Sequence, residues 1–191
     1  MNMTIPKERR PGRWVRTGDA PRRTLRRWEQ EGRILRVRRG LFRRADTPRS
    51  EHHDLAVVAL AVPEGVVCLL SAAAFHGLTT VNPHEIMVAV PREGWVPRMA
   101  HPPVRFFRWT RRQLRAGLLQ RKIEDADVTI TDPEKTVCDC LRHVEVVGRE
   151  AAMEVLRAWL RRRGRSIERL VAVAGPARVS ARLRGYLEAL L

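Results

Sequence analysis

The sequence contains few cysteines and no long apolar run. Its 191 residues include three cysteines, an odd number that does not make a disulfide framework, so we expect a cytoplasmic protein in a reducing compartment. No apolar stretch approaches the roughly 20 residues that span a bilayer. The first 21 residues carry charges that no apolar segment follows, so they do not resemble a secretory signal. These absences argue against membrane-spanning and disulfide-stapled secreted proteins.

The common sequence signatures of enzymes are missing as well. There is no glycine-rich phosphate loop of recognised spacing, no G-x-S-x-G and no H-E-x-x-H. We therefore expect no catalytic residues, no cofactor and no metal, in a protein that is not an enzyme.

Positive charge is abundant and unevenly distributed. The formal net charge is +16 and the isoelectric point is about 11.5. Residues 1–50 contain 16 basic and 5 acidic residues, whereas residues 51–191 contain 21 and 16. A uniform compositional bias would not place two thirds of the net charge in a quarter of the chain. A basic segment of this kind is typical of nucleic-acid binding, with a disordered basic tail or contact with an anionic membrane as alternatives.

The basic segment contains a predicted amphipathic helix over residues 21–31. Asp19 is a possible N-cap before the proline at position 21, and Gly32 would end the helix. Leu25 and Trp28, three positions apart, can face a core while arginines occupy most of the remaining surface.

A short hairpin is predicted directly after this helix. Residues 34–37 and 41–43 are apolar-containing segments around the basic turn Arg38-Arg39-Gly40. A basic helix followed by a basic hairpin is typical of the second half of a winged helix-turn-helix. The predicted DNA-binding residues are Arg22, Arg23, Arg26, Arg27, Arg38, Arg39 and Arg43.

These arginines have different expected roles. Arg22 and Arg23, at the start of the helix, are best placed to reach guanine N7 and O6 in the major groove. Arg38 and Arg39 would lie at the tip of the wing and touch phosphate or the minor groove. Arg43 could add a backbone contact. The alternative is an amphipathic helix with a solvated arginine face.

The predicted DNA-binding segment is shorter than a full winged helix. About two helices normally precede the recognition helix. Here residues 1–20 come before it, and they lack helical periodicity. We therefore expect an irregular basic arm and a truncated winged helix, together forming a domain over residues 1–47.

Residues 51–191 are predicted to form a second domain with helices and a small mixed sheet. The expected helices are 51–62, 72–76, 132–143, 147–163 and 166–191, the last of these containing one or two. The expected strands are 66–70, 85–90, 104–109 and one or two within 121–131. The fold class is therefore α+β, a truncated winged helix-turn-helix segment followed by a mixed α/β domain with a small sheet and C-terminal helices.

Two groups of residues resemble metal sites. Cys138, Cys140 and His143, with Cys68, form a possible zinc set, but positions two apart on a helix point to nearly opposite faces and the usual C-x₂-C turn is absent. His52-His53-Asp54 lacks further ligands at a suitable spacing, and a solvated helix start is the simpler interpretation.

The run Asp132-Pro133-Glu134-Lys135 has two interpretations. Acidic residues beside a lysine resemble the clusters of metal-dependent nucleases, in which Asp132 and Glu134 would hold Mg²⁺ and Lys135 would contact phosphate. The same residues are typical of a helix start, with aspartate at the N-cap and proline at the first helical position. The spacing favours the helix start and leaves a nuclease-like enzyme as an alternative.

Several segments together resemble one family. TLRRW at 24–28 and GRILRVRRGLF at 32–42 resemble the end of the winged-helix domain of AbiEi-type antitoxins. LLSAAAFHGL at 69–78, followed by residues 86–91, resembles the first motif of their second domain, and ITDPEKTVCD at 130–139 resembles a later one.

The resemblance covers roughly residues 20–145 and implies a two-gene type IV toxin–antitoxin system. Family members bind repeats in their own promoter and repress transcription, and their second domain supports neutralisation of a nucleotidyltransferase toxin. The resemblance thus implies double-stranded DNA and such a toxin as partners. A homodimer on repeated DNA is plausible. An antitoxin core without repressor activity is a further alternative.

Overall fold

The computed structural model describes residues 11–190 and divides the chain into two compact units. Residues 1–50 form the N-terminal unit and residues 51–191 the C-terminal unit. The first half of the expected basic arm, residues 1–10, lies outside the described residues. Within residues 11–190, no helix is both long enough and apolar enough to cross a lipid bilayer.

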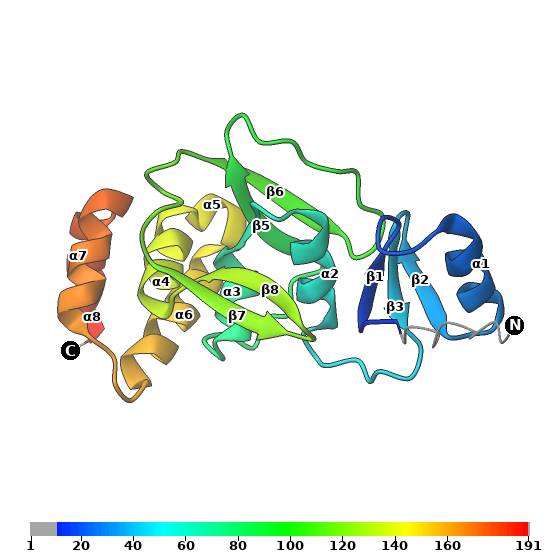
Figure 1. Cartoon of the computed structure of the whole chain (residues 1–191). Helices are drawn as coiled ribbons and strands as arrows, with labels where there is room; N and C mark the ends of the chain where they lie inside the picture. Colours follow the sequence, from blue (N-terminus) through cyan, green and yellow to red (C-terminus); the bar gives the residue numbers. More distant parts are fainter. Residues whose placement is uncertain (1–10, 191) are drawn as a thin grey trace, which may run out of the picture. The chain divides into compact units, whose positions relative to one another are not determined.

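The N-terminal unit is a three-stranded antiparallel sheet with one helix (Figure 1). Its elements are β1 (Trp14–Arg16), α1 (Arg22–Gln30), β2 (Ile34–Arg38) and β3 (Leu41–Arg44), and the strand order is β1-β3-β2. The predicted helix and hairpin are present. The expectation that residues 1–20 are irregular is wrong at β1, where Val15 pairs with Phe42.

A small apolar core holds α1 against this sheet. Leu25 and Trp28 pack with Val15, Ile34 and Phe42, and all five side chains are buried. The spacing of the two helix residues therefore places one face of α1 in the core and leaves its other faces to the arginines.

The start of α1 differs from the prediction. Pro21 occupies the N-cap position, and no side chain accepts a hydrogen bond there. Asp19 closes the preceding turn instead, since its Oδ2 accepts a hydrogen bond from the backbone N–H of Arg16 at 2.7 Å. The proposed cap at Asp19 is therefore wrong, although the helix begins where expected.

The C-terminal unit contains a five-stranded mixed sheet of order β6-β5-β4-β8-β7. The strands are β4 (Val66–Val67), β5 (Ile86–Pro91), β6 (Val104–Trp109), β7 (Leu118–Ile123) and β8 (Ala126–Thr131). β4 runs parallel to β8, and β5 runs parallel to β6, while the other neighbours are antiparallel. The predicted strand over residues 66–70 stops early, because Leu69 begins a helix. A short buried helix and a short buried strand share the same apolar signature.

Seven helices surround and extend this sheet within the described residues. They are α2 (His53–Ala61), α3 (Leu69–Phe75), α4 (Pro133–Arg142), α5 (Val144–Val147), α6 (Arg149–Arg161), α7 (Ile167–Ala177) and α8 (Ser180–Leu190). α4 is the central one, because it packs against α3, α6 and α7. The α+β fold class is confirmed, with the five helices α4 to α8 following the sheet in sequence (Figure 1).

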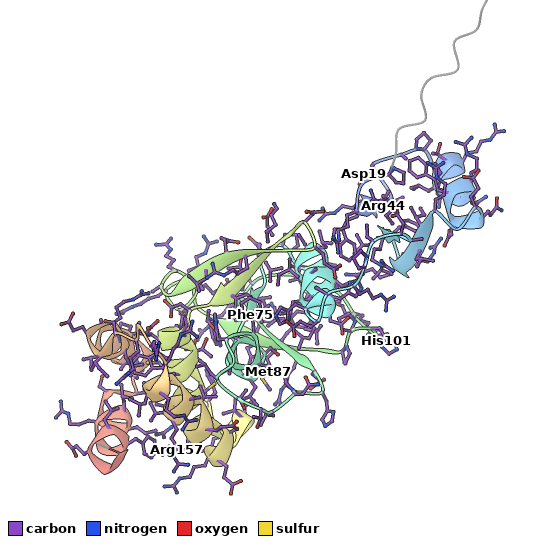
Figure 2. All side chains as sticks on the ribbon, turned by 90° about the horizontal axis from the view of Figure 1, so that it is seen from below. Asp19, Arg44, Phe75, Met87, His101 and Arg157 are labelled. Atoms are coloured by element: carbon purple, nitrogen blue, oxygen red, sulfur yellow. The ribbon has the colours of Figure 1, made fainter. Side chains whose placement is uncertain are left out.

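The main core of the C-terminal unit lies around α4. Side chains of three helices in this core are completely buried: Val137 and Cys140 of α4, Leu156 and Trp159 of α6, and Leu170 of α7. Figure 2 shows that Met87 lies inside this unit, whereas Arg157 of α6 points outward, in agreement with the exposure of Arg157 and the burial of Met87.

Candidate nucleic-acid interface

The exposed face of α1 collects four arginines. Arg22, Arg23, Arg26 and Arg27 are all exposed, and they line one surface hollow together with Thr24 and Gln30. No acidic residue occupies the first turn. The structure therefore brings the four predicted helix residues together on one surface, with Arg22 and Arg23 at the N-terminal end.

The four arginines differ in whether their guanidinium groups form ion pairs within the N-terminal unit. Arg27 lies 3.8 Å from Glu31 one turn along the helix, with both side chains about half exposed. Among residues 11–190, no ion pair or hydrogen bond involves the guanidinium groups of Arg22, Arg23 or Arg26. An exposed cation that has no partner within the protein can contact phosphate or base edges without breaking an existing ion pair or hydrogen bond.

The turn between β2 and β3, which is the predicted wing, is tight and needs glycine. Gly40 has a φ of +80°, which disfavours residues with a side chain. Arg39 beside it is exposed, and Arg38 is half-buried next to a register shift between Arg36 and Arg38. The backbone carbonyl of Gly40 accepts a hydrogen bond from Thr17 at 3.0 Å. The turn before α1 therefore holds the turn between β2 and β3.

Two further arginines connect α1 with β2, and the sequence did not predict this role. Arg36 donates two hydrogen bonds to the carboxylate of Glu29, at 3.0 and 3.1 Å, and lies 5.0 Å above the ring of Phe42. The hydrogen bond from Arg36 lowers the pKa of Glu29. The Arg33 guanidinium lies 5.5 Å above the ring of Trp28. Helix α1 and the β2–β3 hairpin are thus fixed to each other by side chains as well as by the core.

Arg43 does not belong to the exposed set. It is 5% exposed, and its guanidinium donates to the backbone carbonyl of Thr47 and, at 3.2 Å, to the hydroxyl of Thr47. The structure therefore contradicts the prediction that Arg43 contacts DNA. It organises the end of β3, because a buried guanidinium requires partners inside the protein.

Asp132 is occupied by the start of α4. Its Oδ1 accepts a hydrogen bond from the backbone N–H of Lys135 at 2.7 Å, and Pro133 is at the first helical position. Its Oδ2 lies 3.1 Å from the guanidinium of Arg169. The interpretation as a helix cap is confirmed, and both oxygens that a metal would need are already engaged.

Lys135 and Asp139 form a buried ion pair one turn apart. Their Nζ and Oδ2 atoms are 3.1 Å apart, and Lys135 lies 4.8 Å above the ring of Trp109. Burial raises the pKa of Asp139 to about 6, against the opposing charge of Lys135. Lys135 is thus paired with Asp139, and Asp132 is engaged as the cap of α4, so the structure gives the nuclease alternative no support.

The cysteines are buried core residues. Cys68, Cys138 and Cys140 are free thiols, and burial raises the pKa of Cys138 to about 12. In the described part of the chain, no group of three His, Cys, Asp or Glu side chains could hold a metal ion. His143 instead stacks on Trp109 with ring centres 6.0 Å apart.

The histidines near the start of α2 are not a solvated surface. His53 is buried, and its Nδ1 lies 2.9 Å from Oε2 of Glu124. His52 packs on Phe75 with ring centres 4.7 Å apart. Only Asp54 of the three predicted residues is exposed. The expectation of a solvated helix start is therefore wrong, because Glu124 satisfies His53 across 71 positions of sequence.

We expect Asp132→Ala to destabilise the C-terminal unit by about 1–2 kcal/mol, since it removes the cap of α4. Asp132→Asn should retain most of the stability, because asparagine is also a good N-cap. The free energy of unfolding in urea measures both. Equal stability of wild type and Asp132→Ala, together with Mg²⁺-dependent DNA cleavage lost in that variant, would instead support the nuclease alternative.

Comparison with known proteins gives a family, and the search of solved structures gives a chain to which this one is similar. Residues 65–189 match the family model described as the AbiEi antitoxin C-terminal domain, well over half of the chain. A search of curated proteins found no match. Among solved structures, the chain is similar to the RV2827C protein from Mycobacterium tuberculosis, with 14% sequence identity and a TM-score of 0.49. That alignment covers 91% of this chain and 74% of the other.

Proposed function

Because the chain belongs to the AbiEi antitoxin family, we propose that this antitoxin also binds double-stranded DNA at its own promoter and represses transcription there. Family membership supports the antitoxin role and implies a toxin as partner. The observation that carries the DNA-binding part is the set of exposed arginines at the start of α1. In this proposal the protein is a regulator and not an enzyme.

The geometry of α1 supports insertion of its N-terminal end into the major groove. Recognition helices present their first residues to base edges, and arginine is the commonest specific partner of guanine because it donates two hydrogen bonds to O6 and N7. Arg22 and Arg23 occupy the first turn, are exposed, and have no ion pair within residues 11–190. Arg26 and Arg27 follow on the next turn, and we assign them to the flanking phosphates.

The wing supports phosphate or minor-groove contact. Arg39 is exposed at the turn that Gly40 makes possible, with Arg38 beside it. The bonds from Thr17 to Gly40 and from Arg36 to Glu29 hold this turn and α1 in one arrangement. Fixed spacing between helix and wing is what simultaneous contact with a groove and its neighbouring backbone requires.

We assign toxin neutralisation to the C-terminal unit, since the family domain falls entirely within residues 51–191. In this proposal residues 1–47 form a DNA-binding domain and residues 51–191 an antitoxin domain. The toxin is of the nucleotidyltransferase type, and two copies of the chain bind repeated DNA as a homodimer.

Binding to about 200 base pairs of the protein's own upstream DNA, against a scrambled sequence of equal length, tests the repressor proposal. We expect a clear preference for the upstream DNA at about 50 and about 200 mM salt. A site with six or more phosphate contacts should lose roughly 10³-fold in affinity between these concentrations. Weak binding that is indifferent to sequence and disappears at the higher salt would reject the repressor and leave the antitoxin role to the C-terminal unit alone.

A further inference from the structure

The C-terminal unit contains a cavity that the proposed antitoxin and repressor roles do not use. Its volume is about 540 Å³, within the usual range for small-molecule sites. Four segments that are distant in sequence line it: Arg92 directly after β5, the connection between β6 and β7, one face of α4, and α7 with the residue that follows it. Figure 1 shows the last three of them as the green segment after β6, the helix labelled α4, and the orange helix labelled α7.

The lining of this cavity is strongly cationic. Its charged members are Arg92, Arg112, Lys135, Arg142, Arg178 and the carboxylate of Asp139. Arg92, Arg112 and Arg178 are exposed at the rim, and no hydrogen bond or ion pair within residues 11–190 engages their guanidinium groups. Asp139 is already paired with Lys135. An anion entering the cavity would therefore meet three uncompensated guanidinium groups.

The inner end of the cavity is organised by contacts within the protein. Lys135 is 6% exposed and is held by Asp139 at 3.1 Å and by the ring of Trp109. Gly117 lies directly on Lys135, since a Cβ at this glycine would be 2.8 Å from the Lys135 Cβ. Arg142 donates to the backbone carbonyl of Ala177 at 3.3 Å. These positive charges are therefore in place before any ligand arrives, which lowers the entropic cost of binding.

One wall of the cavity is apolar. It is formed by Ala172, Val173, Pro176 and Ala177 of α7, and Ala116 is a further apolar residue of the lining. A flat aromatic ring can lie against small apolar side chains, while charged groups attached to it reach the arginines of the rim. An apolar wall beside a cationic rim thus matches a molecule that has both an aromatic base and several phosphates.

We propose that this cavity binds a nucleoside di- or triphosphate, with the base against α7 and the phosphates at Arg92, Arg112 and Arg178. Arginine suits this role because its planar guanidinium donates two hydrogen bonds to one phosphate. The proposal is independent of promoter binding, since every residue involved lies in the C-terminal unit.

Calorimetric titration of the full chain with ATP, GTP, adenosine and inorganic triphosphate at about 150 mM salt tests the proposal. We expect a nucleoside triphosphate to bind at least tenfold more tightly than adenosine and more tightly than inorganic triphosphate. Arg112→Ala combined with Arg178→Ala should weaken this binding at least tenfold, because both side chains are at the exposed rim and neither contributes to the core.

Arg157→Ala combined with Arg163→Ala is the matched control. It removes the same charge from exposed positions outside the cavity, and it should change the affinity less than twofold. Equal loss in both double variants, or no binding of any triphosphate, would overturn the proposal. Equal affinity for ATP and inorganic triphosphate would overturn the proposal that the base binds against α7.

Two further measurements separate this site from other sources of the same chemistry. A short RNA with a 5′-triphosphate should compete with ATP no better than the same RNA with a 5′-hydroxyl, since the site takes a free nucleotide. Strong competition by the triphosphorylated RNA alone would reassign the site to RNA ends. Arg22→Ala combined with Arg23→Ala should leave nucleotide affinity unchanged, so failure of promoter binding and failure of this site can be told apart.

Discussion

Replacing Arg22 and Arg23 together with alanine should weaken binding to the upstream DNA by about 100-fold or more. Each good bidentate contact with a base contributes roughly 1–3 kcal/mol to discrimination, and both side chains are exposed in the first turn of α1. Binding to unrelated DNA should fall much less, since it depends on phosphate contacts from the remaining arginines. Titration of labelled upstream and scrambled DNA at one salt concentration gives both affinities.

Two control variants separate base contacts by Arg22 and Arg23 from phosphate contacts and from a general loss of positive charge. Arg38→Ala should weaken binding to both DNAs by similar factors, as expected for a residue beside the backbone. Arg157→Ala combined with Arg163→Ala removes two charges from the C-terminal unit and should leave the preference for upstream DNA intact. Equal losses on all sequences for the Arg22 and Arg23 double variant and for Arg38→Ala would refute the roles assigned to helix and wing.

Trp28→Ala should unfold the N-terminal unit and abolish promoter binding while the C-terminal unit stays folded. Truncation of a buried tryptophan costs about 3–5 kcal/mol. Among residues 11–190, the cluster that Trp28 belongs to contains four other buried side chains, so little remains to hold α1 on the sheet. Hydrogen exchange followed by mass spectrometry should show full exchange across residues 14–44 and protection retained in α4 and α6.

Trp95→Ala is the matched control for this variant, because Trp95 is 77% exposed. It should leave both exchange patterns and promoter binding unchanged. Loss of protection in α4 and α6 of the Trp28→Ala protein would contradict the proposal that residues 1–47 and 51–191 are separate domains.

Elements with strong local signals could be predicted from the sequence. The start of α4 carries aspartate and proline at adjacent positions, and the observed cap uses both. The hairpin of β2 and β3 is marked by Gly40, whose positive φ the turn requires. α1 is marked by Leu25 and Trp28, which form its buried face. In each case the residues that carry the signal lie within a few positions of one another.

Elements that depend on distant partners could not be predicted. β1 has three residues, too few for an alternating pattern, and exists because it pairs with β3 far along the chain. The apolar run 66–70 is equally compatible with strand and helix, and the packing of Leu69 inside the unit decides between them.

The candidate site shows the same division between local and distant information. Charge and helix periodicity identify Arg22, Arg23 and Arg39, all of which are exposed. They do not distinguish these residues from Arg43, which is buried because Thr47 supplies its partners. The cationic cavity has no sequence signature, since its lining comes from four separate segments.

Some of the exposed arginines lie on the edge strands of the two sheets, where they affect pairing with other molecules. β1 and β2 end the small sheet, and β6 and β7 end the large one. Exposed cations lie on each of these four strands: Arg16, Arg36, Arg105 and Arg121 are examples. A terminal strand has backbone groups that can pair with a strand of another molecule, and charged side chains hinder that pairing. Joining the edges of two copies would bring like charges together, so these arginines oppose aggregation through open sheet edges whatever the chain binds.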